Sequence, residues 1–116
     1  MAPLHIDTPL LRAPPDLFGP ERTVWLKMDA LQASGSFKMR GVCHLVQRRV
    51  ADGAKAVVCA SGGNAGMAAT MAARACGVPV TIVVPQSTVA SVREAIAARG
   101  ATLIVHGAVW DESHAF

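Results

Sequence analysis

Four short runs rich in valine and isoleucine, separated by longer helical patterns, constrain the fold of this 116-residue chain more than any other feature. Nearly continuous apolar runs are typical of strands that are buried on both faces of a sheet. Strands that alternate with helices imply right-handed crossovers. We therefore expect an α/β fold with a doubly wound, mostly parallel sheet and helices on both faces. The four runs are residues 23–28, 56–60, 80–84 and 102–106.

The segments between these runs carry helical patterns. From residue 39 to residue 50, apolar side chains recur at the spacing of an amphipathic helix, and Asp52-Gly53 predicts where that helix ends. Ser36 is its expected N-cap. The proline-rich residues 14–20 predict a surface loop. Further helices are expected at residues 64–76, 89–99 and 110–116.

Composition narrows the classes of partner. The chain is 52% hydrophobic and 16% charged, which indicates a folded core. Its net charge of +3 comes from scattered basic residues with few aromatics, so no nucleic-acid partner is expected. The most apolar stretch, residues 65–84, is interrupted by Arg74, Gly77 and Pro79, so no membrane span is expected. Three cysteines without metal-ligand spacing predict no metal site and fit a reduced, cytoplasmic setting.

The stretch SGSFKMRG, residues 34–41, places Lys38 between a Ser/Gly turn and the first turn of an expected helix. We expect this lysine to be buried there. Burial and the positive end of the helix dipole both disfavour a charged ammonium group. A neutral amine can attack a carbonyl carbon and form a covalent bond, so Lys38 is a candidate catalytic residue. The plain alternative is a lysine whose stem lies on apolar surface with its head in water.

A second motif, SGGNAG at residues 61–66, follows a predicted strand and opens a helix. Ligands bind at the carboxyl ends of strands in parallel sheets. Glycines let the backbone approach a ligand closely, and the free N–H groups of a helix start favour an anion. The motif therefore predicts a site for a phosphate or a carboxylate, although a glycine-rich turn can also serve packing alone. It is not GxGxxG and has no P-loop ending, so neither of those nucleotide sites is indicated.

Taken together, these segments resemble the serine/threonine dehydratase family of pyridoxal-phosphate enzymes, which belongs to the β-family or fold type II. The resemblance rests on VWLKMD at residues 24–29, SGSFKMRG, SGGNAGMA and GVPVTIVVP at residues 77–85, in that order. It covers nearly the whole chain. It is nearest to the L-serine dehydratase branch, because Ala65-Gly66-Met67 follow Asn64 where threonine dehydratases usually have His-Ala-Gln-Gly.

The resemblance implies pyridoxal 5'-phosphate as the cofactor and gives roles to individual residues. Lys38 would bond to the cofactor aldehyde and later remove the α-proton of the substrate. Phe37 would lie against the pyridine ring, and Asn64 would hydrogen-bond the ring hydroxyl. The implied reaction is α,β-elimination from L-serine, with L-threonine as a further candidate, to a 2-oxo acid and ammonia. The residues implied to bind the substrate carboxylate are Ser61, Gly62, Gly63 and Asn64.

The resemblance also implies a domain organisation. Residues 1–32 are expected to pack with a larger domain, and residues 33–116 are expected to form a small, substrate-side α/β domain that is incomplete at its C-terminal end. The family's glycine-rich phosphate loop and the group facing the pyridine nitrogen are expected beyond Phe116, in a protein that forms a homodimer. This chain alone is therefore expected to be an inactive fragment.

Two alternatives stay open from the sequence. One is another reaction of the same family, either threonine-specific deamination or serine racemisation. The other is a non-catalytic α/β module in which residues 62–66 bind an anion and Lys38 supplies only a counter-charge.

Overall fold

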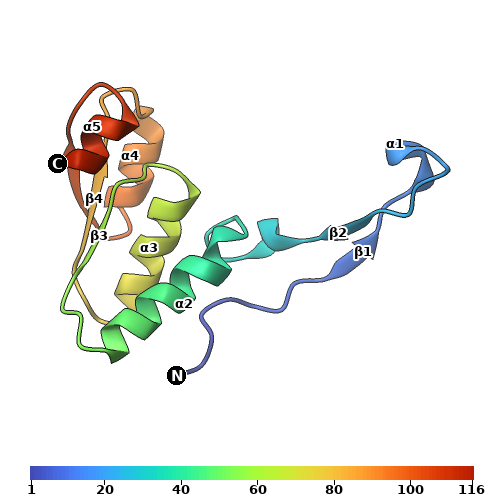
Figure 1. The fold of residues 1–116 in the computed structure, drawn as a ribbon, viewed down its shortest axis with the longest axis horizontal. Helices are drawn as coiled ribbons and strands as arrows, with labels where there is room; N and C mark the ends of the chain where they lie inside the picture. The colour runs from blue at the N-terminus through green and yellow to red at the C-terminus, as the bar shows by residue number, and fades with distance from the viewer.

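The computed structural model describes residues 1–116, which form a layered domain and a long N-terminal arm (Figure 1). The domain is built on a parallel three-stranded sheet, which confirms the α/β prediction. In this sheet β4 lies in the centre, with Val80 paired to Val57 on one side and Thr81 paired to Thr102 on the other. The three strands, in spatial order, are β3 (Val57–Cys59), β4 (Val80–Val84) and β5 (Thr102–Val105).

Helices lie on both faces of this sheet, as expected. The crossover helices α3 (Asn64–Ala75) and α4 (Ala90–Ala97) pack on the same face, because two right-handed crossovers that progress in one direction must do so. α5 (Trp110–Ala115) follows β5 and contacts β4. Ser113 of α5 and Phe116 after it border a hollow on the other face, which Thr81 and Val83 of β4 also line.

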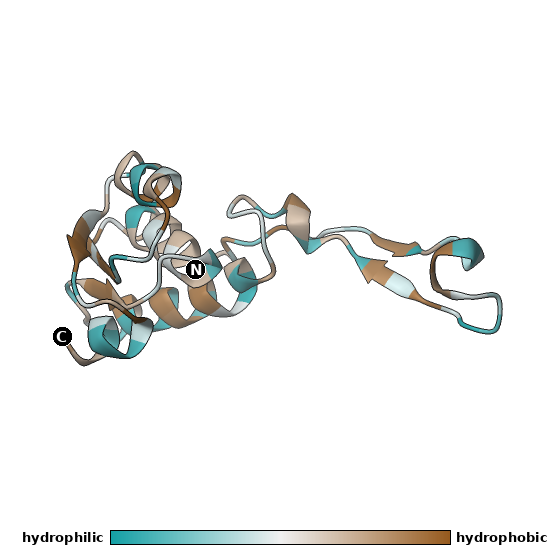
Figure 2. Ribbon diagram, turned by 90° about the horizontal axis from the view of Figure 1, so that it is seen from above, coloured by the Kyte–Doolittle hydropathy of each residue, from teal (hydrophilic) through white to brown (hydrophobic).

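The core has two halves that meet in α3, and Figure 2 shows apolar residues concentrated on the strands of the domain. Toward the sheet, Ala69 and Ala73 join the buried residues Val80, Ile82 and Val84 of β4, together with Ile96 of α4. Away from the sheet, α3 meets α2 (Lys38–Ala51), which runs along it. The residues buried in that second half are Met39, Cys43, Val46, Ala68 and Ala72.

The N-terminal arm differs from the prediction. The run at residues 23–28 was expected to join a buried parallel sheet, but β2 (Trp25–Lys27) pairs antiparallel with β1 (Leu10–Arg12) instead. Lys27 lies within the run, and only Leu26 of β2 is partly buried, so the strand does not suit a sheet covered on both faces. Between the two strands, the expected proline-rich loop contains one helical turn, α1 (Pro15–Phe18).

The arm gives the molecule its elongated shape. The two-stranded ribbon projects away from the domain, and the whole chain extends over 49 × 36 × 23 Å (Figure 1). A 3₁₀ turn, η1 (Asp29–Leu31), joins the arm to the loop that precedes α2. None of the helices is both long and apolar enough to cross a membrane.

The central strand should dominate the stability of the domain. Ile82→Ala removes a fully buried side chain from β4, and we expect the free energy of unfolding to fall by about 2–5 kcal/mol. Val58→Ala is the matched control in the neighbouring strand, because the Val58 side chain is 72% exposed. Its effect should stay within about 0.5 kcal/mol. Urea unfolding followed by circular dichroism measures both, and equal effects of the two changes would contradict the packing described.

Candidate functional site

The start of α2 presents Lys38, which is the first residue of that helix. The loop before it turns at Gly35, whose φ of +74° lies in the left-handed region that glycine adopts without strain. The Gly35 N–H donates a hydrogen bond to the Gln32 carbonyl at 2.7 Å. The backbone of Lys38 is thus set by a defined turn and a helix, while its side chain leaves the first helical turn.

The Lys38 side chain is exposed, so the expectation of burial was wrong. Met39 takes the inward position against α3 and is only 4% exposed. Successive helical residues point about 100° apart, so Lys38 cannot share that direction. Neither ion pair of the structure involves Lys38, and its Nζ lies 5.2 Å from the centroid of the exposed Phe37 ring, a cation–π contact. The amine is therefore available to an added partner.

Ser36 does not cap α2, contrary to the prediction. Phe37 is the N-cap residue and makes no capping hydrogen bond through its side chain. The Met39 and Arg40 N–H groups donate to the carbonyls of Ser36 and Phe37 at 3.2 and 3.1 Å, so a tight turn formed by backbone bonds begins the helix. The Ser36 hydroxyl is left buried and without a hydrogen-bond partner. Such a group in a native structure calls for a water, a ligand or another explanation.

The SGGN loop lies at the carboxyl end of β3, as predicted. Gly63 is the N-cap of α3 and offers no side chain, so the N–H groups of the first turn remain open to an anion. The Gly63 N–H donates to the Ser61 Oγ at 3.3 Å, which holds the hydroxyl on the same loop. Asn64 is the first residue of α3 and is exposed.

Two glycines determine how closely this loop packs. A Cβ atom on Gly66 would lie 1.8 Å from the Ser61 carbonyl oxygen, so the loop rests directly on the first turn of α3. A Cβ atom on Gly62 would lie 2.9 Å from Cγ2 and 3.1 Å from Oγ1 of Thr88. The loop is thereby packed against both its own helix and the segment that follows β4.

Thr88 and Trp110 are residues at this edge that sequence reasoning missed. The Trp110 Nε1–H donates to the Ala60 carbonyl at 2.5 Å, immediately before the SGGN loop, and the indole stacks on His114 with ring centroids 4.7 Å apart. The predicted parallel sheet contained the information needed to place both residues. The carboxyl ends of parallel strands share one edge, so residues that follow β4 and β5 must gather near the loop that follows β3.

An ion pair anchors the start of α2 from its other side. The Arg40 Nε and Nη2 donate to the two carboxylate oxygens of Asp29 at 2.9 and 3.0 Å. The Thr8 hydroxyl donates to the same carboxylate at 2.6 Å. The Arg40 hydrogen bonds, followed by that of Thr8, hold the pKa of Asp29 well below its ordinary value, and the Asp29 carboxylate raises the pKa of Arg40.

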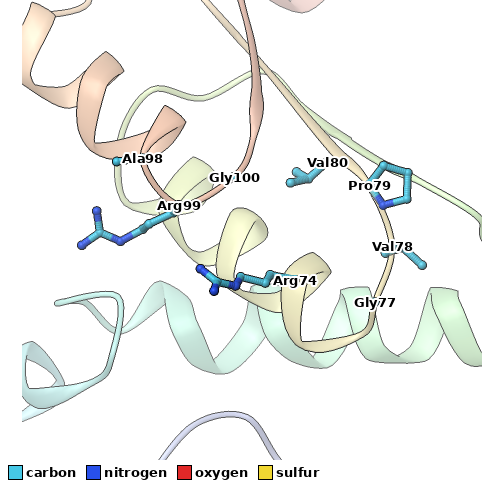
Figure 3. Close-up of a pocket in the computed structure, with 8 residues that line it drawn as sticks. All are labelled: Arg74, Gly77, Val78, Pro79, Val80, Ala98, Arg99 and Gly100. Carbon is cyan, nitrogen blue, oxygen red and sulfur yellow. The ribbon is translucent and has the colours of Figure 1, made fainter.

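The packing of α2 on α3 brings the two motifs to one side of the domain. Met39 and Cys43 pack with Ala68 and Ala72, and both helices run toward the lower end of the domain in Figure 1. The beginning of each helix, which carries a motif, therefore faces the same way. A hollow of about 420 Å³ lies at the opposite edge of the sheet, beside Arg74 and Arg99 (Figure 3), and none of the predicted site residues lines it.

Comparison with known proteins gives a consistent result. The profile of the family described as "Pyridoxal-phosphate dependent enzyme" matches residues 1–116. The chain is 44% identical over 112 residues to the human protein named "Serine dehydratase-like", covering 97% of this chain and 34% of that protein. It is 47% identical over 111 residues to the human "L-serine dehydratase/L-threonine deaminase", with 96% and 34% covered. The chain thus spans about a third of the length of these relatives.

Solved structures share the fold. An L-serine ammonia-lyase from the fungus Rhizomucor miehei superimposes with a TM-score of 0.86 and 38% identity, over 97% of this chain and 36% of that one. The serine racemase of Dictyostelium discoideum gives a TM-score of 0.81 and 30% identity, over 96% of this chain and 36% of that one.

Gly66 offers a direct test of the loop geometry. Gly66→Ala should lower the free energy of unfolding by about 1–3 kcal/mol, because the new methyl group would meet the backbone at Ser61 and force the loop to move. Gly41→Ala is the matched control: it is also a glycine-to-alanine change within a helix, and its added Cβ would meet nothing within 4 Å. It should stabilise by about 0.5–1 kcal/mol. Urea midpoints measure both changes, and a neutral Gly66→Ala would show that the close contact is absent.

The Asp29 carboxylate should make stability dependent on acid. Its pKa in the folded state is lowered from the ordinary 3.8, so its stabilising contribution is complete above that value and is lost as the pH falls toward the lower one. Thermal midpoints of wild type and Asp29→Asn should differ most near neutral pH. The difference should shrink below about pH 4. A gap that stays constant from pH 7 to pH 3 would disprove the assignment.

Proposed function

The chain belongs to the family of pyridoxal-phosphate-dependent enzymes, and from this premise we propose that the protein deaminates L-serine by α,β-elimination, with L-threonine as a second substrate. One observation carries the proposal. Lys38, whose amine takes part in neither ion pair, is the first residue of α2. It lies on the side of the domain where the SGGN loop leads into α3. The names of the two human relatives support the choice of substrates.

The residues present suit this cofactor chemically. Lys38 provides an exposed amine that can bond to an aldehyde, and Phe37 next to it provides a flat apolar ring. The buried Ser36 hydroxyl, one residue before Phe37, has no hydrogen-bond partner in the structure. The uncapped start of α3, with its glycines, suits a carboxylate.

We assign the following roles. Lys38 would hold the cofactor through Nζ, and the same amine would accept the proton from the substrate Cα. Phe37 would lie against the cofactor ring, and the Asn64 side chain would hydrogen-bond the ring hydroxyl. When bound, pyridoxal phosphate supplies the electron sink for the elimination. The groups that bind and orient the substrate carboxylate are the Ser61 hydroxyl and the backbone N–H groups of Gly62, Gly63 and Asn64.

We further infer that residues 1–32 pack on a larger domain of the protein and that residues 33–116 form the substrate-side domain. The arm supports this division, because Leu10, Leu11 and Trp25 are each more than half exposed. Apolar side chains gathered on one exposed segment indicate a contact surface. We place the groups that hold the cofactor phosphate outside this chain. We also propose that the complete protein forms a homodimer in the cytoplasm. The three free cysteines fit a reducing compartment.

Serine racemisation is the second candidate, favoured by the likeness to the Dictyostelium discoideum enzyme. Both reactions begin with removal of the Cα proton, so the residues above serve either one. They differ in product. Incubation of the complete protein with L-serine should release pyruvate and ammonia, whereas D-serine as the main product would favour racemisation.

Lys38→Ala tests the central assignment in the complete protein. We expect loss of the visible absorbance of lysine-bound cofactor and a fall in pyruvate formation of at least about 10³-fold, because both the covalent anchor and the base are removed. Lys55→Ala, a change at an exposed lysine that takes part in neither ion pair, is the control and should leave both unchanged. Borohydride reduction followed by peptide mass spectrometry should find the pyridoxyl group on Lys38. A label on another lysine would refute the assignment.

A further inference from the structure

We propose that the Asp29–Arg40 ion pair is a positioning device that sets where Lys38 stands relative to the N-terminal segment. The inference rests on the proposed function, because it concerns the approach of Lys38 to the cofactor. It assigns Arg40 and Asp29 no contact with cofactor or substrate. They act through the backbone at the start of α2.

The Asp29–Arg40 ion pair has a defined geometry and is partly shielded from water. Arg40 approaches the carboxylate with Nε at 2.9 Å from Oδ2 and Nη2 at 3.0 Å from Oδ1, so the contact is bidentate. Two parallel hydrogen bonds of this kind fix orientation as well as distance. The side chains of Arg40 and Asp29 are 30% and 12% exposed, so water competes with the pair only in part. The other ion pair of the chain, Arg48–Asp52, spans 3.7 Å, lies within α2 and its end, and is exposed.

Asp29 also connects Arg40 to the residues that precede the hairpin. Its Oδ1 accepts hydrogen bonds from the Thr8 hydroxyl at 2.6 Å and from the Gln32 Nε2 at 3.3 Å. Gln32 in turn is held by both backbone groups of Ile6, with an N–H to Oε1 distance of 3.0 Å and an Nε2 to O distance of 2.8 Å. Thr8 and Gln32 are almost fully buried, so the centre of this polar cluster is shielded from water.

This cluster holds the chain on both sides of Lys38, the first residue of α2. Gln32 holds the chain immediately before residues 33–37, and Arg40 holds it one turn after them. Lys38 lies between the two anchors. The direction of the side chains matters as well: residues 38 and 40 point about 200° apart on a helix, on either side of Met39. Arg40 can therefore be bound to Asp29 and Thr8 while Lys38 points in another direction.

Apart from its backbone turn, the start of α2 has few other contacts that fix its direction. Phe37 provides no side-chain cap, and the Ser36 hydroxyl has no partner. Met39, Cys43 and Val46 pack α2 against α3, but of these residues only Met39 lies in the first turn of the helix. Arg40 supplies the second fixed point that defines the direction of the first turn. Displacement of a reacting group by about 1 Å can cost up to about 100-fold in rate, so such a fixed point has consequences for Lys38.

The test compares covalent and non-covalent binding in the complete protein. Apo protein is mixed with pyridoxal phosphate, and the rate of bonding to Lys38 is followed by absorbance. In that reaction the amine attacks the aldehyde carbon, a carbon–nitrogen double bond forms and water leaves. Pyridoxine phosphate, which has no aldehyde, reports non-covalent binding alone. The variants are Arg40→Lys, which keeps the charge but not the bidentate contact, and Arg48→Lys as the matched control on the same helix.

We expect Arg40→Lys to slow covalent bonding by about 10- to 100-fold while its affinity for pyridoxine phosphate stays within about twofold of wild type. Asp29→Asn should behave in the same way, and Arg48→Lys should match wild type in both measurements. Parallel loss of both kinds of binding, in step with a lower thermal midpoint, would show a merely structural role and overturn the inference. Bonding at the wild-type rate in Arg40→Lys would overturn it too.

The outcome separates the inference from the proposed function. If wild-type protein never bonds to pyridoxal phosphate at Lys38, the proposed function fails. If wild type bonds normally and both Arg40→Lys and Asp29→Asn do as well, only the positioning role fails.

Discussion

Four alanines in α3 are the constraint on which the rest of the structure depends. Ala69 and Ala73 face the sheet, whereas Ala68 and Ala72 face α2, and all four are 0–2% exposed. A single methyl group at each position lets α3 approach both layers closely. Larger side chains there would separate α2 from the sheet. Both motifs depend on that spacing, because one lies at the start of α3 and the other at the start of α2.

Elements that are defined by local pattern could be predicted from the sequence. β4 has the predicted bounds because its five residues form a continuous run in the centre of the sheet. α3 ends at Ala75, before Gly77 takes the left-handed conformation with φ +70°, as a helix terminator does. The antiparallel ribbon could not be predicted in this way. Its pairing depends on which distant segment supplies the partner strand, and no local pattern in residues 10–12 marks them as that partner.

In the candidate site, too, the features set by local sequence could be predicted and those set by distant contacts could not. The motifs placed Lys38 at the start of α2 and the SGGN loop at the start of α3, since turn chemistry and helix periodicity are local. The exposure of Lys38 was mispredicted because it depends on which neighbour in the helix packs inward, and that position belongs to Met39. Thr88 follows β4 and Trp110 follows β5, so only the order of strands in the sheet reveals that they lie near the loop.

Two different kinds of contact, made by Met39 and Arg40, hold the beginning of α2 just after Lys38. On one side Met39 is buried against α3, and on the other Arg40 is bound to Asp29 and Thr8. A helix with a good N-cap has a local reason to begin where it does. α2 lacks one, so contacts with distant segments add to the local backbone turn in holding its first turn in place. Under the positioning role proposed above, a change in residues 6–8 or 29–32 should alter the position of Lys38. Reactive groups that need a defined position are commonly carried in this way by a loop or helix end that a rigid scaffold holds from several directions.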